Sequence, residues 1–170
     1  MKRLATALGW ALVAAAGAGC GTRPARVPSR PPAPVDAPTD MVVRTPPTAV
    51  NWDDRPGADG IPVLVHLFRR PDGSLPVMVR GRIRFDLYEG ILRPEDISAA
   101  SPWRTWQFQG EQLRLRAVRT PEGWGYAFRL GFSNARPATS AVTVVTRYVG
   151  PDGRTVLVER TVLPTSPRRR

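Results

Sequence analysis

The sequence predicts a mostly β protein, an antiparallel β-sandwich of about seven strands with at most one short helix. Segments rich in valine, isoleucine, leucine and aromatic residues recur at short intervals, and Gly, Pro and Asp separate them. No long stretch carries its apolar residues at helical spacing only. A chain of short, one-faced strands must bury its apolar faces against each other, which favours two packed sheets.

The segment 123–132 is the strongest strand candidate. Five large apolar side chains alternate there with smaller residues and therefore share one face of a strand: Trp124, Tyr126, Phe128, Leu130 and Phe132. The opposite face carries Gly125, Ala127 and Gly131. We expect this strand to be central in its sheet and paired on both edges.

The remaining strands are expected at 61–69, 77–90, 101–108, 140–150 and 154–163, with a turn at 151–153. Within 77–90, four polar residues share one face and predict a solvated sheet surface: Arg80, Arg82, Arg84 and Asp86. Gly81 interrupts this strand and indicates a bulge or a close backbone approach. Residues 110–118 fit either a strand or one or two helical turns.

The stretch VRGRIRFDLYEG, residues 79–90, resembles the first-repeat pattern of transthyretin-like or carboxypeptidase-regulatory modules. That resemblance, together with about seven short strands, leaves two alternatives for the sandwich, immunoglobulin-like or transthyretin-like.

The N-terminus has the layout of an export signal. Lys2 and Arg3 precede an uncharged run, residues 4–18, and the only cysteine, Cys20, follows. Ala18, Gly19 and Cys20 resemble the signal of bacterial lipoproteins, which implies a lipidated Cys20 as the mature N-terminus. Gly21 in place of aspartate then implies the outer membrane of a bacterial cell envelope. The alternative is ordinary cleavage after Ala18, which would leave a free thiol.

The chain therefore divides into four predicted parts: a lipoprotein signal peptide at 1–19, a lipidated N-terminus with a disordered proline-rich tether at 20–46, the sandwich domain at 47–164, and a disordered basic tail at 165–170. The tether holds seven of the chain's prolines and is expected to be extended, spanning at most about 80 Å. A single cysteine allows no disulfide within the chain, so the fold must depend on its apolar core.

Charge composition points to the partners of an exported protein. The chain has 25 Lys and Arg against 14 Asp and Glu, a formal net charge of +11. Such an excess is typical of nucleic-acid binding, but the export signal removes nucleic acid from reach. We expect the membrane, through the lipid anchor, and an envelope protein or polysaccharide as partners, and no nucleic acid.

A search for catalytic patterns yields little. The only histidine, His66, lies between apolar residues in a strand, where a packed and hydrogen-bonded imidazole is the usual state. No nucleophile, zinc or phosphate-loop motif occurs in the sequence, so we expect no enzyme and no cofactor. The acidic loop offers Asp53, Asp54 and Asp59 as weak calcium ligands, and a tight turn is the preferred interpretation.

Two functions follow as hypotheses. The first is a non-enzymatic envelope lipoprotein whose sandwich has a structural or protein-interaction role. The second is a module that binds a glycan or another anionic polymer. Trp52 and Trp103, which are expected beside loops, would provide stacking platforms, and Arg80, Arg82 and Arg84 would provide charge.

Overall fold

The structure is a computed structural model that describes residues 29–53, 56–69, 75–132 and 136–165. Cys20, Asp54 and residues 166–170 lie outside these ranges, so the expectations for the lipid anchor and the basic tail stay predictions. Among the described residues, no helix is long and apolar enough to cross a membrane.

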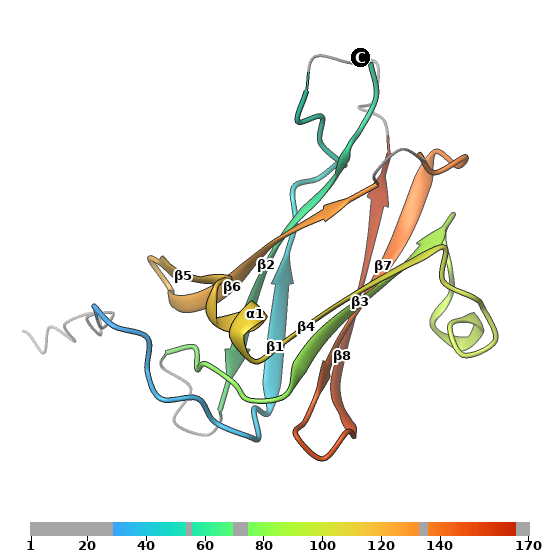
Figure 1. Ribbon diagram of the computed structural model, residues 1–170. Helices are drawn as coiled ribbons and strands as arrows, with labels where there is room; N and C mark the ends of the chain where they lie inside the picture. Colours follow the sequence, from blue (N-terminus) through green and yellow to red (C-terminus); the bar gives the residue numbers. More distant parts are fainter. Residues whose placement is uncertain (1–28, 54–55, 70–74, 133–135, 166–170) are drawn as a thin grey trace, which may run out of the picture.

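Eight strands in the described ranges form two antiparallel sheets (Figure 1). The first sheet has the order β1 (Asp40–Arg44), β2 (Gly60–Phe68), β6 (Gly123–Gly131) and β5 (Ala117–Thr120). The second has the order β4 (Arg104–Gln109), β3 (Arg82–Glu89), β7 (Ala141–Val149) and β8 (Thr155–Pro164). The predicted antiparallel sandwich is confirmed, with one strand more than expected.

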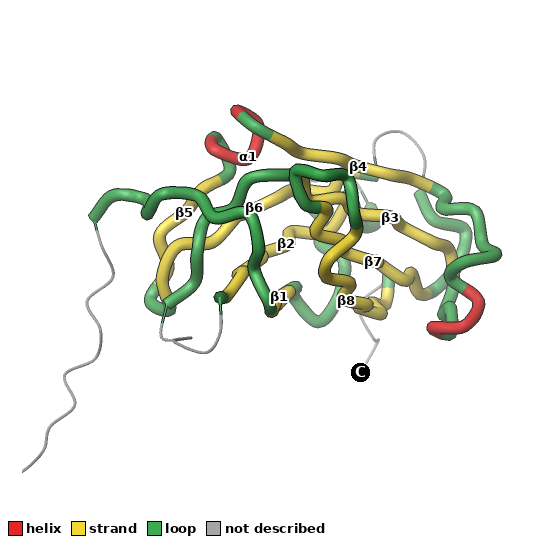
Figure 2. The backbone as a smooth tube through the Cα atoms, turned by 90° about the horizontal axis from the view of Figure 1, so that it is seen from below, coloured by secondary structure: helices red, strands yellow, loops and turns green. Residues whose placement is uncertain are grey.

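The order of the strands matches the immunoglobulin-like alternative. Immunoglobulin constant-type sandwiches have the strands A-B-E-D in one sheet and C-F-G in the other. The same orders appear here when β4 is set aside and the other seven strands are lettered A to G in chain order. The further strand, β4, lies beside β3 at the edge of the second sheet. Figure 2 shows the two rows of strands from below, close together at β1 and β8 and spread apart at β5 and β4, where α1 (Glu111–Arg114) lies.

The strand β6 is central, as the sequence predicts. It pairs with β2 along one edge and with β5 along the other. Tyr126, Phe128, Leu130 and Phe132 are buried, and Trp124 packs against the same core. Phe128 joins the two sheets, because its ring lies 4.9 Å from the Phe85 ring and 4.7 Å from the Phe108 ring, centroid to centroid.

The predicted strand 77–90 is two separate pieces. Val77 bridges to Leu67 of the first sheet, and Val79 bridges to Val35, whereas β3 begins only at Arg82 and belongs to the second sheet. Gly81 makes the crossing with a φ of 92°, and a Cβ there would lie 2.4 Å from the carbonyl oxygen of Val149. The close backbone approach expected at Gly81 is therefore confirmed.

The domain begins earlier than predicted. The segment assigned to the tether contains β1, which pairs with β2 over its whole length, and Val35, which donates its N–H to the Met78 carbonyl oxygen. Met41 in this strand is buried in the core. The flanking prolines, Pro38 and Pro46, predict a spacer, but the seven residues between them are enough for a five-residue edge strand.

Residues 110–118, which the sequence left open, contain both alternatives. Glu111–Arg114 is a single helical turn with Leu113 buried, and β5 begins at Ala117. A short 3₁₀ turn, Pro94–Asp96, completes the helical structure of the described residues. The loop around this turn folds back over the second sheet, since Leu92 donates its N–H to the Thr143 hydroxyl and Arg160 donates to the Leu92 carbonyl oxygen.

Candidate binding groove

The residues suggested for glycan binding do not form one site. Trp52 is 38% exposed, lies against Gly60 at the end of the first sheet, and has the Arg129 guanidinium 5.6 Å from its ring centroid. Trp103 instead packs edge-on against buried Phe132, 6.1 Å between centroids, at the rim of the core. The two indoles therefore lie on different sides of the end of β6.

The arginine row is split as well. Arg80 pairs with Asp36 on the surface at 3.1 Å, and Arg82 is half-buried. Arg84 pairs at 2.8 Å with Asp86.

The expectation of a solvated face is wrong for Asp86, which is only 1% exposed. Its carboxylate accepts hydrogen bonds from Arg84, Arg147 and, at 2.7 Å, the Thr105 hydroxyl. These donors come from three neighbouring strands, β3, β7 and β4. Such a buried carboxylate with three donors is a structural cross-link of the second sheet.

The acidic loop has the geometry of a turn. The Asp59 carboxylate accepts the backbone N–H groups of Trp52 (2.6 Å) and Asp53 (3.1 Å), and the Asn51 side chain also accepts the Asp53 N–H (2.9 Å). These are the Asx hydrogen bonds that the turn interpretation predicts. Within the described part of the chain, no group of three or more His, Cys, Asp or Glu is placed to hold a metal ion.

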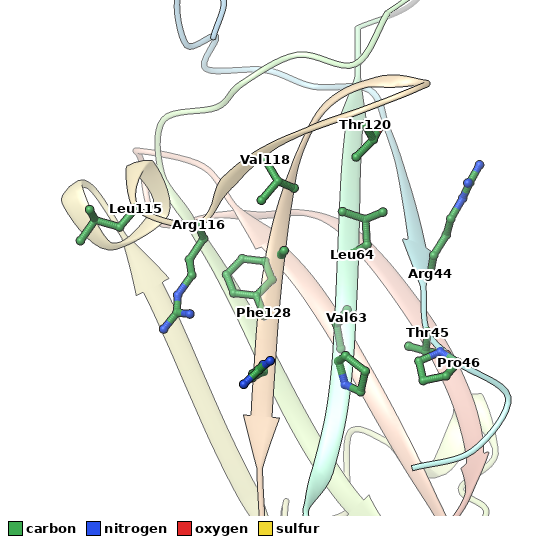
Figure 3. Close-up of a pocket in the computed structure, with 13 residues that line it drawn as sticks. Arg44, Thr45, Pro46, Val63, Leu64, Leu115, Arg116, Val118, Thr120 and Phe128 are labelled. Carbon is green, nitrogen blue, oxygen red and sulfur yellow. The ribbon is translucent and has the colours of Figure 1, made fainter. Parts of the chain in front are cut away.

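A different feature, a groove on the outer face of the first sheet, is the best candidate for a binding site (Figure 3). It has a volume of about 670 Å³. Its floor consists of outward-facing residues of the three strands β2, β5 and β6: Pro62, Leu64, Val118 and Ala127. Leu115 and Arg116 flank one side, and Arg44, Thr45 and Pro46 flank the other.

The hollow exists because β6 carries a small residue, Ala127, on its outer face between β2 and β5. The inner face of β6 is filled by aromatic side chains, whereas Ala127 leaves the outer surface low beside Leu64 of β2 and Leu115 after α1. The other small residues of this face lie outside the groove, Gly125 under His66 and Gly131 beside Trp52. The alternation of large and small residues was visible in the sequence. The walls were not, because Arg44 and Leu115 are distant in sequence and meet the floor only through the order of the strands.

Three arginines surround the apolar floor. Arg44 pairs with Glu122 at 2.7 Å, and that contact, together with the Glu122 backbone N–H, holds the pKa of the Glu122 carboxyl down at about 2. The guanidinium of Arg116 lies 5.6 Å from the Phe108 ring and that of Arg129 5.6 Å from the Trp52 ring. Neither of these two has an ion-pair partner in the described ranges, so the rim offers positive charge.

His66 lies on the same face of the first sheet, beyond the groove and near the β5–β6 turn. Its side chain covers Gly125, where a Cβ would be 2.8 Å from the imidazole Cδ2, and the residue is only 1% exposed. Its Nε2 is 3.1 Å from the Thr120 hydroxyl, which donates its own proton to the Gly123 carbonyl oxygen. The imidazole is therefore the donor to Thr120, so it is not arranged to activate that hydroxyl as a nucleophile.

Burial lowers the pKa of His66; nearby Glu122 acts in the opposite direction and Arg44 adds to the lowering. Because His66 is the only histidine, its titration can be followed through the stability of the whole domain. A lowered folded-state pKa means that the unfolded chain takes up the proton first as the pH falls. The contribution of neutral His66 to the free energy of unfolding is then fully present above about pH 6.5. It is lost as the pH falls from there through the folded-state pKa of His66.

We therefore expect the free energy of unfolding to decrease between about pH 7.5 and pH 5.5, and His66→Gln to remove most of that decrease. Urea denaturation of the wild-type protein and the variant at a series of pH values measures the pH dependence of the free energy of unfolding. Equal pH dependence in the two proteins would show that His66 does not resist protonation in the fold.

Comparison with protein-family models, with curated proteins and with solved structures finds no match to this chain. An apolar floor that spans β2, β6 and β5, bordered by a basic rim, has the features of a binding groove. The floor lies on regular strands, so it is rigid and already formed.

Proposed function

We propose that the chain is a non-enzymatic lipoprotein of the bacterial cell envelope whose sandwich binds a protein segment in the groove on its first sheet. The observation that carries the proposal is the combination of an apolar floor with a rim of Arg44, Arg116 and Arg129. When a partner covers an apolar floor, binding is favoured by about 25 cal/mol for each Å² of apolar surface removed from water. A basic rim adds a preference for acidic partners.

The groove favours an extended segment over a bulky domain. Its floor runs across neighbouring strands between walls formed by Arg116 on one side and Arg44 on the other (Figure 3). A single extended chain with apolar side chains toward the floor and carboxylates toward the rim satisfies both features. The glycan alternative requires tryptophans and arginines on a common surface, and Trp52, Trp103 and Arg84 do not share one, which supports the protein segment.

Photo-crosslinking from inside the groove tests this function. We expect a photoreactive phenylalanine analogue at Ala127, on the groove floor, to give one discrete crosslinked protein in intact cells. The matched control is Gln107, an exposed residue on the other sheet, which should give none. Leu64→Arg in the groove should abolish the crosslink from Ala127, because it places a charge on the apolar floor.

Equal crosslinking from Ala127 and Gln107, or a crosslink that survives Leu64→Arg, would contradict a role for the groove. The far-UV circular dichroism and urea midpoint of each variant serve as the control for folding. Leu64 is only partly buried on the outer face, so its replacement should leave the core intact.

The anchor is a proposal from the sequence alone, with Cys20 as the lipidated residue. The early start of the domain shortens the spacer, since Val35 is already part of the fold. Residues 21–34 can span at most about 45 Å, against the 80 Å expected for the longer tether. The groove would then lie within reach of partners close to the membrane surface.

Cys20→Ser is expected to abolish incorporation of labelled fatty acid and to move the protein into the soluble fraction. Fractionation of cells expressing each form measures both effects. If the variant stayed with the membrane, the apolar run 4–18 itself would be the anchor, and the lipoprotein proposal would fail.

A further inference from the structure

A second hollow lies beside α1, on the side where the two sheets spread apart (Figure 2). We call it the α1 pocket. Its lining comes from the segments 30–34, 78–81 and 110–114, together with Ala117 of β5 and Tyr126 of β6. Its volume is about 550 Å³, within the range of about 300–1,000 Å³ that is usual for small-molecule sites. It shares no lining residue with the groove on the first sheet.

The interior of the α1 pocket is apolar and reaches the core. Met78, Val79, Leu113 and Tyr126 line it, and all four are buried members of the hydrophobic core. Ala117 also lines the pocket and is too small to fill the space between them. A ligand that enters here would therefore contact core side chains rather than a wet surface.

The wall formed by residues 30–34 is stiff and held in place. Pro31, Pro32 and Pro34 line the pocket, and each proline ring fixes its own φ angle. Val35, directly after them, donates its N–H to the Met78 carbonyl oxygen and accepts the Arg80 N–H, both at 2.9 Å. Because this wall is already ordered, a ligand would lose little free energy in forming the site.

One hydrogen-bond donor in the pocket has no acceptor. The Tyr126 hydroxyl accepts the Val79 N–H at 2.9 Å, and no described residue accepts its proton. Tyr126 is only 2% exposed, and burial raises the pKa of its hydroxyl, which therefore keeps that proton at neutral pH. A phenol can donate as well as accept, so this group can still bind an oxygen atom of a ligand.

The charged residues of the lining are mostly arginines. Arg30, Arg80 and Arg114 line the pocket together with a single acid, Glu111. Arg114 pairs with Glu111, and Arg80 pairs with Asp36. Arg30 has no ion-pair partner in the part of the chain that the structure describes. The pocket therefore has a net positive charge, which favours a ligand with one negative group.

We propose that the α1 pocket binds a long-chain fatty acid. The hydrocarbon chain would lie against Met78, Leu113 and Ala117, and the carboxylate would accept hydrogen bonds from the Tyr126 hydroxyl and the arginines. The donor and the charge lie on the same side of the pocket, because the Tyr126 hydroxyl is bonded to Val79 and Arg80 follows directly.

Other classes of small molecule fit this lining less well. A neutral hydrocarbon would leave the Tyr126 proton and the positive charge without a partner, and both would be covered by the ligand. A sugar or a nucleotide would place several polar groups against apolar side chains that offer them no hydrogen bonds. A fatty acid has one long apolar part and one anionic group, as the lining requires.

Fluorescence titration with cis-parinaric acid, a fatty acid that becomes bright in apolar surroundings, tests the proposal. The protein is the full chain carrying Cys20→Ser, which has no thiol to be acylated. We expect saturable binding of one molecule per chain and displacement by palmitate. Hexadecanol, which has the same chain length but no charge, should displace the probe about tenfold less well. Absence of saturable binding, or equal displacement by hexadecanol and palmitate, would overturn the proposal.

Three substitutions locate the fatty acid. Ala117→Phe adds a ring inside the pocket and should weaken binding at least about tenfold. Arg30→Gln should weaken it about threefold, because Arg30 is exposed and its charge is screened. The matched control is Arg93→Gln, an exposed arginine in the loop after β3 that does not line the pocket. Equal affinities of the Ala117→Phe and Arg93→Gln proteins would show that the fatty acid binds elsewhere.

Photolabelling of the Cys20→Ser protein gives the same information without a substitution in the pocket, should Ala117→Phe fail to fold. A fatty acid with a photoreactive diazirine in its chain should label residues 30–34 or 78–81, which mass spectrometry of the digested protein identifies. Label confined to 44–46 and 62–64, which line the groove on the first sheet, would overturn the assignment to the α1 pocket.

Discussion

Phe128→Ala is expected to cost about 3–5 kcal/mol of the free energy of unfolding. Phe128 is 2% exposed at the centre of β6, and its ring contacts Phe85 and Phe108 from the opposite sheet and Tyr126 from its own strand. Removing the ring leaves a cavity where the two sheets meet, and packed strands on both sides of β6 limit how far the site can collapse. A whole domain of this size is stable by only about 5–15 kcal/mol.

Urea denaturation at neutral pH measures this loss, and Arg82→Ala is its control. Arg82 is half-buried on the outer face of β3, with no ion pair in the described ranges, and its truncation should change stability by no more than about 0.5 kcal/mol. Equal losses in the two variants would mean that the ring of Phe128 is not what holds the sheets together.

Asp86→Ala is expected to cost about 3 kcal/mol, the second largest effect. The Asp86 carboxylate is the shared acceptor of Arg84, Arg147 and Thr105, and without it the half-buried guanidinium of Arg147 loses its counter-charge. The loss should also appear as a weaker attachment of β4 to β3, because Thr105 is the contribution of β4 to this cluster.

The control for Asp86 is Asp36→Ala, which removes an ion pair of the same chemistry on the surface. The side chains of Arg80 and Asp36 are both more than half exposed, and such pairs contribute about 0–1 kcal/mol. The urea midpoints of the two variants show whether loss of the buried aspartate lowers stability more than loss of the exposed one. If Asp36→Ala were as damaging as Asp86→Ala, burial would not explain the role of Asp86.

The alternation of side chains along single strands was enough to predict the class of fold. In 123–132, five large residues in phase predicted a central strand, since one face so apolar must be covered and its backbone must be paired on both sides. The turn at 151–153 and the close backbone approach at Gly81 could also be predicted from the local sequence. Each depends on the conformational preference of a few neighbouring residues.

Features that depend on residues distant in the sequence were missed or misread. Asp86 has the same alternation as the arginines beside it, and only the meeting of β3, β4 and β7 buries it among three donors. The strand β1 was taken for part of the tether because its pairing partner, β2, follows a long loop that the local pattern does not reveal.

By itself, the sequence determined that this protein is a sandwich built from one-faced strands, and that the outer face of β6 would carry only small residues apart from Arg129. The tertiary structure alone decided that one of these small residues, Ala127, lies on the floor of a groove. Arg44 and Arg116 become its rim because β1 and the end of α1 come to lie on opposite sides of β2 and β6 (Figure 3). A local pattern specifies which face of a strand is apolar or small, whereas the order of strands in the sheet specifies what lies beside it.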